Sequence, residues 1–242
     1  MKQMLHLRKK GLKRAVLLIL LAVLHCNNTA LYDEALTRYY RVVRPGLNEW
    51  YPLNGNLSSR IGSADGSATG AYTAGINRAG ESGKAVCVTA SEINFASANF
   101  RTNPGTVSAW LKFNTTASGS LFQNGDASTF YIGFRFRQTG LPGIEATYGS
   151  GGGGGTSPVT SVTTGIWYYL AFSYGNGRAN FYIAPYGGNL TNVFSSSGPY
   201  APSAFPLRFF NAVAADACID DLVSYGRELS ADEVRENFLT LE

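Results

Sequence analysis

Histidine is almost absent from this sequence of 242 residues, which contains two. Both of them, His6 and His25, lie in the first 25 residues, a segment that we expect to be removed on export. The remaining chain would then contain no imidazole. This excludes a Ser-His-Asp or Cys-His nucleophile system, and it excludes a zinc site with histidine ligands.

Carboxylates are scarce in the middle of the chain. Between Ile93 and Ala215 the sequence contains two, Asp126 and Glu145, each in or beside a different loop or strand end. Glycoside hydrolysis needs a pair of carboxylates that flank the scissile bond. We interpret Asp126 as a turn former and Glu145 as an exposed strand residue, and we predict that the protein is not an enzyme.

An excess of positive charge is lacking once the N-terminal segment is set aside. The formal net charge is +4, from 20 basic and 16 acidic residues. Six basic residues and no acidic residue precede position 26, so the rest of the chain carries 14 basic and 16 acidic side chains, a net charge of −2. A chain with this balance has no basic footprint for a nucleic acid.

The N-terminal apolar run is too short to span a bilayer comfortably. Ala15–Leu24 has ten residues and follows a basic stretch, which is typical of a secretory signal peptide. We therefore expect residues 1–25 to be a signal peptide and residues 26–47 to be a linker. The protein is expected to be exported.

The residues around the first cysteine, Val23–Cys26, resemble a bacterial lipobox. In that motif Cys26 would be lipidated and become the mature N-terminus. His25 departs from the motif, because the position before the cysteine normally holds a small residue. The alternative is ordinary cleavage slightly downstream, with Cys26 discarded. The first interpretation predicts a lipid-anchored protein of the bacterial cell envelope, and the second predicts a secreted protein.

Glycine and aromatic residues are abundant, with 28 Gly, 14 Tyr and 14 Phe, which favours many short strands and tight turns. The spacing of the apolar and β-branched runs is typical of an antiparallel sandwich. Asn54–Gly83 and the glycine run Gly149–Gly155 are expected to be loops. The expected strands are Lys84–Thr89, Thr106–Phe113, Ser120–Gln123, Thr129–Arg137, Gly143–Tyr148, Ile166–Tyr174, Ala179–Ala184 and Pro206–Asn211.

The chain ends in a strand and a capped helix. Cys218–Tyr225 is apolar and β-branched enough to be extended. Ser230 is a suitable N-cap, Glu233 three residues later completes a capping box, and Val234 and Phe238 share one face of the helix. We predict an all-β protein, a two-sheet antiparallel β-sandwich with a short C-terminal helix.

Four stretches of the sequence, in the same order, resemble laminin G-like domains of the concanavalin A-like lectin and glucanase superfamily. They are W-Y-P-L-N-G-N at Trp50–Asn56, G-T-V-S-A-W-L-K-F at Gly105–Phe113, I-W-Y-Y-L-A-F-S-Y at Ile166–Tyr174, and I-D-D-L-V-S-Y-G-R-E-L-S-A-D-E-V at Ile219–Val234. The resemblance implies a jelly-roll sandwich. We expect it to occupy residues 48–242 as one domain.

Alternation within the strands predicts an outward face of aromatic and basic side chains. Flat aromatic surface beside hydrogen-bonding groups suits sugar rings. The alternative is that Trp110 and Trp167 form a satellite core that loops cover. The candidate residues of the ligand-binding face are Trp110, Lys112, Tyr131, Arg135, Arg137, Trp167, Tyr169, Asn180 and Tyr182.

The resemblance also raises the question of calcium, which many relatives bind through an aspartate of the closing strand. Asp220 matches that position. Calcium takes roughly six to eight oxygen ligands, and the loop that usually contributes, Leu57–Gly62, has Ser and Arg where relatives more often have Asp-Ser-Ser-Gly. Calcium binding by Asp220 and a purely structural role for Asp220 and Asp221 are both consistent with the sequence.

Two cysteines remain when Cys26 is assigned to the lipobox. In an oxidising compartment Cys87 and Cys218 have a single intramolecular pairing. Sandwiches of this family also lay the two ends of the chain side by side, which would bring the strand of Cys87 to the closing strand. We predict a disulfide, and the alternative is two separate buried thiols.

The predicted function is non-catalytic recognition by an exported domain. By resemblance, the partner is carbohydrate, or a glycosylated or matrix surface, contacted by the aromatic face or by the loops Asn54–Gly83 and Gly149–Gly155. Nucleic acid is not expected as a partner. A glycan-cleaving enzyme of the same superfamily and a structural envelope lipoprotein without a soluble ligand are the alternatives.

Overall fold

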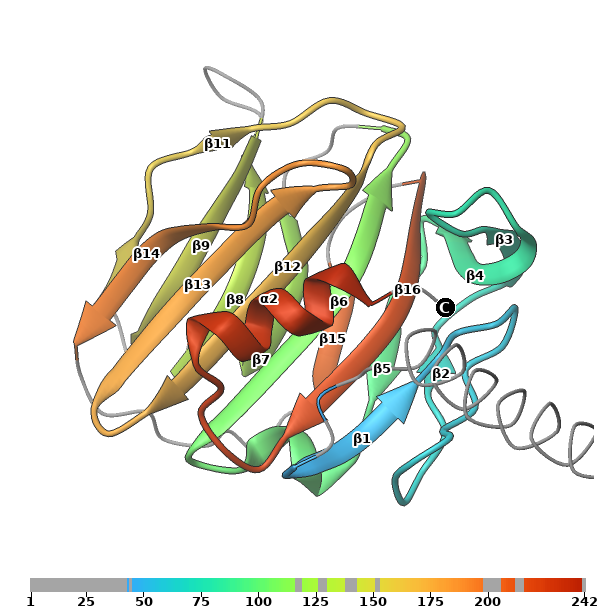
Figure 1. Cartoon of the computed structure of the whole chain (residues 1–242). Coiled ribbons are helices and arrows are strands. Elements are labelled where there is room, and N and C mark those ends of the chain that lie inside the picture. The colour runs from blue at the N-terminus through green and yellow to red at the C-terminus, as the bar shows by residue number, and fades with distance from the viewer. Residues whose placement is uncertain are drawn as a thin grey trace, which may run out of the picture.

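The computed structural model describes residues 43, 45–115, 119–125, 130–137, 143–150, 153–197, 206–211 and 216–240. Most of the strands in these ranges belong to two antiparallel sheets, A and B, which pack face to face (Figure 1). The expected signal peptide, most of the expected linker and Cys26 lie outside the described residues, as does Asp126.

Sheet A has eight strands, and the closing strand lies near its centre. In spatial order they are β14 (Thr191–Ser197), β13 (Arg178–Pro185), β12 (Trp167–Gly175), β6 (Gly105–Phe113), β16 (Asp216–Tyr225), β4 (Ser82–Thr89) and β3 (Tyr72–Ile76), with β1 (Leu47–Tyr51) also paired to β16. The first half of β16 pairs with β4 and its second half with β1, so both ends of the described chain meet at this strand.

Sheet B also has eight strands. In spatial order they are β10 (Gly153–Thr156), β9 (Gly143–Ser150), β8 (Phe130–Arg137), β7 (Gly119–Gly125), β15 (Leu207–Asn211), β5 (Ile93–Phe95) and β2 (Ser67–Ala68), with β11 (Thr160–Ser161) paired to β9. A 3-10 helix, η1 (Ala98–Arg101), and one α-helix, α2 (Ala231–Leu239), complete the described elements.

The main core lies between the two sheets and is rich in phenylalanine. In β8, Ile132, Phe134 and Phe136 alternate with outward residues and are all buried, as a period of two requires. Phe122 of β7 stacks on Phe209 of β15 with ring centroids 4.6 Å apart. The prediction of an all-β, two-sheet antiparallel sandwich with a short C-terminal helix is confirmed.

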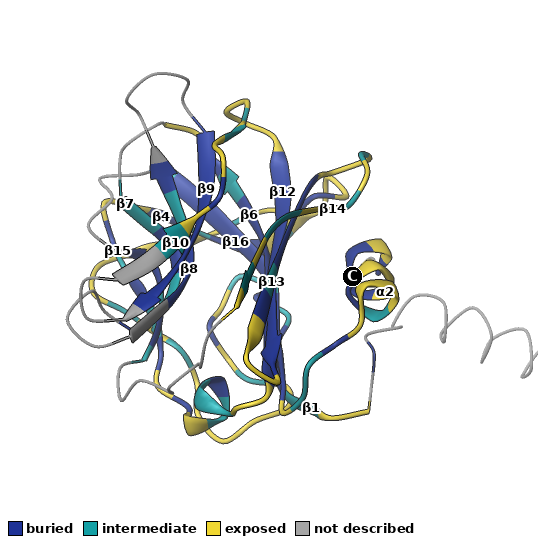
Figure 2. Ribbon diagram, turned by 90° about the vertical axis from the view of Figure 1, so that its left-hand side faces the viewer, coloured by how far each residue is buried: buried dark blue, intermediate teal, exposed yellow. Residues whose placement is uncertain are grey.

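A second apolar layer lies outside sheet A, where α2 packs against the strands (Figure 2). The helix begins as predicted: Ser230 accepts a hydrogen bond from the backbone N–H of Glu233, whose side chain accepts one from the N–H of Ser230. Val234 and Phe238 are buried against the sheet. The helix therefore closes one outer face of the sandwich.

Two expected loops contain strands. Within Asn54–Gly83 the edge strand β3 pairs with β4; it is mostly exposed, so it has no need of an apolar pattern. The glycine run, from Gly149 to Gly155, includes the end of β9 and the first residues of β10, and these two strands pair with each other. A Cβ at Gly155 would lie 2.8 Å from the ring of Phe194. Close packing, and not only turn formation, accounts for that glycine.

In the part of the chain that the structure describes, neither helix is long and apolar enough to cross a membrane.

Candidate functional site

The nine residues proposed for one aromatic and basic face lie in both sheets. Six belong to sheet A, on β6, β12 and β13, whereas Tyr131, Arg135 and Arg137 belong to β8 of sheet B. The prediction of a shared face is wrong in this respect. Alternation shows which residues of one strand point the same way, but it does not show which sheet the strand joins.

The aromatic residues of sheet A are covered by α2. Trp110 and Tyr169 are 1% and 2% exposed, and the ring of Phe238 lies 5.5 Å and 5.7 Å from theirs. Trp167 and Tyr182 are buried as well. These residues form the satellite core that was the alternative interpretation, with the helix in the place of the loops.

The two polar candidates of sheet A are half-buried at the margin of this layer. Lys112 places its ammonium group 5.2 Å from the ring centre of Trp167. Asn180 accepts a hydrogen bond of 2.8 Å from the hydroxyl of Ser195 on the neighbouring strand. Both side chains therefore already have partners within the sheet.

The space that remains under α2 is too small for a sugar. A cavity of about 10 Å³ is lined by Ser108, Tyr169 and Asp221 from the sheet and by Asn237 and Thr240 from the helix side. That is room for the centre of one water molecule. Burial raises the pKa of Tyr169 well above its ordinary value, so its hydroxyl stays neutral there.

Asp220 lies at a β-bulge in the closing strand, where the register with β6 shifts and Asp221 has a φ of 44°. The buried guanidinium of Arg78, from the turn between β3 and β4, donates to Asp220 at 2.7 Å and pairs with Asp221 at 2.5 Å. It also donates to the carbonyl of Thr240 at 2.8 Å and lies 4.9 Å from the ring centre of Trp110.

These contacts do not fit a calcium ion at Asp220. The carboxylates of Asp220 and Asp221 already share the guanidinium of Arg78 as their cation. A calcium ion at this place would be repelled by that positive charge. Burial disfavours the charge of Arg78, but the attraction of Asp221 and Asp220 outweighs it and raises the pKa of Arg78. Among the described residues no cluster of three or more acidic, cysteine or histidine side chains could hold a metal. The geometry supports the structural role of the aspartate pair.

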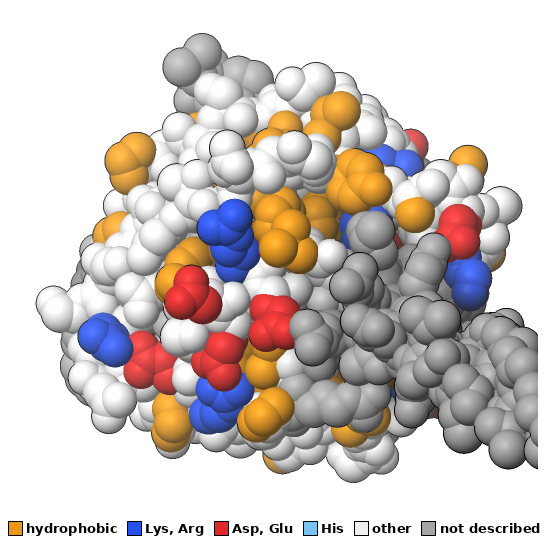
Figure 3. Space-filling view, in the orientation of Figure 1, with side chains coloured by type: hydrophobic (Ala, Val, Ile, Leu, Met, Phe, Trp, Pro, Cys, Tyr) orange, Lys and Arg blue, Asp and Glu red, His pale blue; other side chains and the backbone are white. Residues whose placement is uncertain are grey.

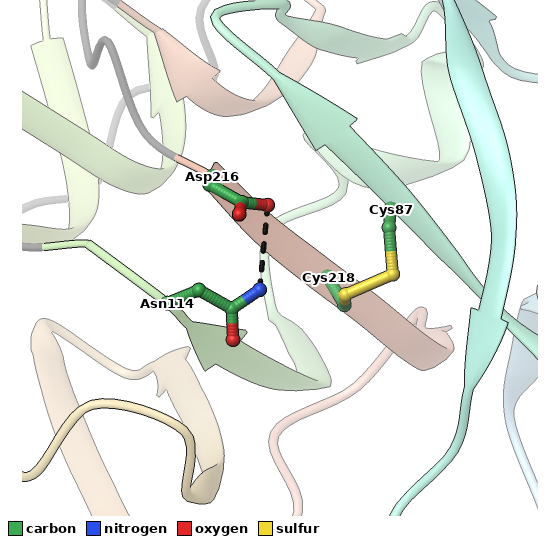
Figure 4. The surroundings of a disulfide bond; sticks show 4 residues. All are labelled: Cys87, Asn114, Asp216 and Cys218. Carbon is green, nitrogen blue, oxygen red and sulfur yellow. Dashed lines mark hydrogen bonds between the residues drawn. A yellow bond between two sulfur atoms is a disulfide. The ribbon is translucent and has the colours of Figure 1, made fainter.

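The predicted disulfide is present between Cys87 of β4 and Cys218 of β16 (Figure 4). The two residues are direct partners in the register of these strands, with their Cα atoms 4.0 Å apart. The bond joins positions separated by 131 residues. It fixes the closing strand to the beginning of the domain.

The outer face of sheet B has a different character. Directly paired residues of antiparallel strands point to the same side, and one such row crosses the whole sheet without an apolar side chain. We call it the polar row. It consists of Ser67, Asn94, Arg208, Gln123, Gly133, Thr147 and Thr156.

The half of the polar row that runs from β2 to β7 is more exposed to solvent than the part on β8 and β9. Asn94, Arg208 and Gln123 are half-buried and Ser67 is exposed, whereas the residues on β8 and β9 are buried. At strand spacings of about 4.8 Å, the accessible half from β2 to β7 spans about 14 Å.

The position of β8 in the row is a glycine for a steric reason. A Cβ at Gly133 would lie 2.0 Å from the carbonyl oxygen of Phe122 on the neighbouring strand. Beside it on β8, Arg135 donates from Nε to the buried carboxylate of Glu145 at 3.0 Å. Glu145, predicted to be an exposed strand residue, is therefore buried and ion-paired.

The two outer faces differ in composition. Over α2 acidic side chains gather, and hydrophobic side chains lie on the strands next to it (Figure 3). The sequence analysis did not predict two exposed aromatic residues, Tyr186 at 44% and Tyr72 at 41% exposure. Tyr72 lies on β3 of sheet A, and Tyr186 lies in the turn after β13. Each lies outside the four recognised stretches, next to a turn or on an edge strand, where alternation gives no signal.

A laminin G-type family model, described as the concanavalin A-like lectin/glucanases superfamily, matches residues 88–235, more than half of the chain. The chain belongs to the concanavalin A-like lectin/glucanases superfamily. The resemblance is thereby confirmed at the level of the domain; three of the four stretches lie within the matched residues, and Trp50–Asn56 lies before them. No curated protein matches the sequence.

Solved structures of carbohydrate-related proteins have a similar fold. Domain 4 of AbnA, an extracellular GH43 arabinanase from Geobacillus stearothermophilus in complex with arabinotriose, is 21% identical with a TM-score of 0.63, covering 80% of this chain and 98% of that domain. Trypanosoma rangeli sialidase is 16% identical with a TM-score of 0.52, covering 82% of this chain and 33% of the sialidase.

A mutant of the same sialidase that displays trans-sialidase activity is 14% identical with a TM-score of 0.55, covering 83% of this chain and 35% of that one. The present chain thus spans about a third of the length of the sialidases. At these identities the likeness shows the fold alone.

Proposed function

We propose that this chain is an exported, non-catalytic recognition domain that binds carbohydrate on the outer face of sheet B. The polar row carries this proposal. Its accessible half, with Asn94, Arg208 and Gln123, offers amide and guanidinium groups in one line, which is the pattern that sugar hydroxyls require. The superfamily, and the arabinotriose complex of the similar domain, support carbohydrate as the ligand class.

A binding role is favoured over hydrolysis by the distribution of carboxylates. The strands of sheet B contain a single acidic residue, Glu145. Its carboxylate accepts a hydrogen bond from Arg135 and is buried. Most retaining and inverting hydrolases need a second carboxylate across the bond. Turnover of a glycan that Glu145→Gln abolishes would favour the enzyme instead.

The N-terminal sequence supports export. Residues 1–25 have the pattern of a signal peptide, and Val23–Cys26 resembles a lipobox, so we place the mature protein in the bacterial cell envelope with a lipid on Cys26. Processing that stops in the presence of globomycin is the expected result. A precursor that matures normally in the drug would mean a secreted protein without the anchor.

The direct test is a glycan array with matched variants. Gln123→Ala removes an amide from the accessible half of the polar row, and Asn180→Ala removes one from sheet A. We expect the first to weaken binding at least tenfold and the second to leave it unchanged. Loss of binding in Tyr186→Ala but not in Gln123→Ala would move the site to sheet A. Absence of any glycan binding would favour a structural envelope protein.

A further inference from the structure

Three buried oxygen atoms belong to the residues that line the small cavity between sheet A and α2. The residues are Ser108 of β6, Tyr169 of β12 and Asp221 of β16. Ser108 Oγ, Tyr169 OH and Asp221 Oδ1 each have no hydrogen-bond partner among the described residues. Buried polar groups of native proteins are nearly always paired, either within the protein or with ordered water. Three such oxygens around one cavity therefore point to a partner that they share.

The bulge of β16 brings Asp221 to this cavity. Successive side chains of a regular strand point to opposite faces, yet the buried guanidinium of Arg78 pairs with both Asp220 and Asp221. Asp221 has a φ of 44°, a left-handed conformation that is unfavourable for a residue other than glycine. Its Oδ2 atom meets Arg78, and its Oδ1 atom does not. The strained backbone thus supplies the cavity with an acceptor.

The other two oxygens belong to hydroxyl groups. Burial raises the pKa of Tyr169, so its hydroxyl keeps the proton and can donate. Ser108 is fully buried, and its hydroxyl can donate or accept. Ser108 lies near enough to Tyr169 to oppose the rise in the pKa of Tyr169, but the two form no hydrogen bond of ordinary geometry. The three groups therefore comprise one that can only accept and two that can donate.

We propose that a single ordered water molecule occupies this cavity and bridges Ser108, Tyr169 and Asp221. A water molecule can accept from Tyr169, donate to Asp221 and bond to Ser108 in either sense, so it satisfies all three oxygens. The cavity of about 10 Å³ has room for one water, and buried waters typically make about three hydrogen bonds.

Other classes of ligand fit this cavity poorly. An anion would be repelled by the carboxylate of Asp221, and a metal ion would be repelled by the guanidinium of Arg78 that holds the same carboxylate. An apolar group would leave the three buried oxygens unpaired, which is unfavourable. The site is thus specific for a small neutral molecule that both donates and accepts hydrogen bonds.

The water belongs to the contact between the sheet and the C-terminal helix. Asn237 of α2 and Thr240 at its C-cap line the same cavity from the helix side. A water at this place links three neighbouring strands beneath the end of α2. This inference does not depend on the proposed carbohydrate-binding function.

A crystal structure at a resolution that shows ordered waters is the direct test. We expect one density peak at about 2.5–3.0 Å from each of Ser108 Oγ, Tyr169 OH and Asp221 Oδ1. A cavity without density would overturn the proposal. An anomalous peak at the same place in a crystal soaked in rubidium would also overturn it, because it would identify a monovalent cation.

Oxygen-17 relaxation dispersion of the purified chain tests the site in solution, because it counts water molecules that leave the interior slowly. Ser108→Val places methyl groups in the cavity, and we expect it to lower the count by one. Tyr169→Phe keeps the ring and removes one donor, so it should shorten the residence time of the water about tenfold, the equivalent of one hydrogen bond. It also preserves the test if Ser108→Val does not fold.

Ser173→Ala is the matched control. Ser173 is a second fully buried serine of sheet A, but its hydroxyl donates directly to the carbonyl of Leu229 and accepts from Thr106, and it does not line the cavity. The slow water should remain in this variant. A signal that is unchanged in both cavity variants would overturn the proposal, and an equal loss in Ser173→Ala would mean general loosening of the sheet and would contradict the assigned site.

Discussion

Inward and outward side chains alternate along the strands of both sheets, but the two outer faces of the sandwich differ in what covers them. On sheet A the outward residues include Trp110, Tyr169 and Tyr182, and α2 covers them. On sheet B the polar row lies on the outside, and no helix in the described part of the chain lies over it. Outward aromatic residues on a strand therefore indicate a face to be covered as readily as a face that binds, and their accessibility decides between the two.

This contrast predicts that substitutions on the covered face affect stability, whereas substitutions on the polar row affect binding. The polar row contributes little apolar burial, so Gln123→Ala should change the free energy of unfolding by less than about 0.5 kcal/mol. The covered face should behave in the opposite way.

The disulfide should give the largest effect. Replacing both Cys87 and Cys218 by Ala releases a constraint over 131 residues, and we expect the free energy of unfolding to fall by up to about 5 kcal/mol, since the unfolded chain regains the entropy of that loop. Urea denaturation measures it. Labelling of both cysteines by an alkylating reagent in denatured, unreduced protein would show that the bond does not form.

Arg78→Met should come next. The substitution keeps much of the side-chain volume but leaves two buried or half-buried carboxylates without their cation, which costs about 3–5 kcal/mol. Arg178→Met breaks an exposed ion pair and should cost less than about 1 kcal/mol. Because Arg78 supplies the positive charge, EGTA should not change the melting temperature of the native protein. A lower midpoint in EGTA would mean that a metal contributes after all.

Phe238→Ala should cost about 3 kcal/mol, because the ring fills the space between α2 and the tryptophan of β6. The adjacent Leu239 is 63% exposed, so Leu239→Ala in the same helix turn is the matched control and should cost less than about 0.5 kcal/mol. Thermal unfolding of the two variants measures the difference. Equal effects would mean that α2 does not pack on sheet A in solution.

The smallest effect concerns the start of α2 and depends on pH. Hydrogen bonds from Arg227 lower the pKa of Glu233 from 4.5 to about 2, with the backbone N–H of Ser230 adding to the effect. A lowered pKa in the folded state means stability that is present above pH 4.5 and is lost as the pH falls to about 2. Glu233→Gln should therefore cost about 1 kcal/mol at pH 7 and almost nothing near pH 2.

Melting curves of the native protein and of Glu233→Gln between pH 7 and pH 2 check this prediction. Glu236→Gln, on the exposed side of the helix, is the control. A difference between native protein and Glu233→Gln that stays constant over the whole range would contradict the assigned pKa.

Local patterns predicted the elements of the fold well. Each expected strand from Lys84 onwards overlaps an observed one, and the capped helix starts at the expected residue, because period-two alternation and capping depend on neighbours in sequence. The exposed edge strands β3 and β14, the glycine strand β10 and the short strands β2, β5 and β11 were missed. The strand β10 carries no apolar signal, and the large apolar residues of β3, Tyr72 and Ile76, are exposed. The pairing of β10 and β3 therefore depends on their partners β9 and β4.

The candidate site was predicted less well, and Arg78 shows why. Its sequence context, a turn between two strands, resembles that of any exposed arginine. It becomes a buried cation because the bulge of β16 places Asp220 and Asp221 beside that turn. Arg208 and Gln123 likewise become neighbours by pairing of β15 with β7, which are far apart in the sequence.

The sequence by itself determined the all-β class, the capped C-terminal helix and the superfamily, because each follows from local pattern. It predicted the Cys87–Cys218 bond with two separate thiols as the alternative, and the pairing of β4 with β16 decided between them. Only the tertiary structure decided which strands share a sheet, that α2 covers the aromatic face, and that an arginine satisfies Asp220. These features depend on contacts between residues distant in the chain, and side-chain alternation is the same on a covered face as on an open one.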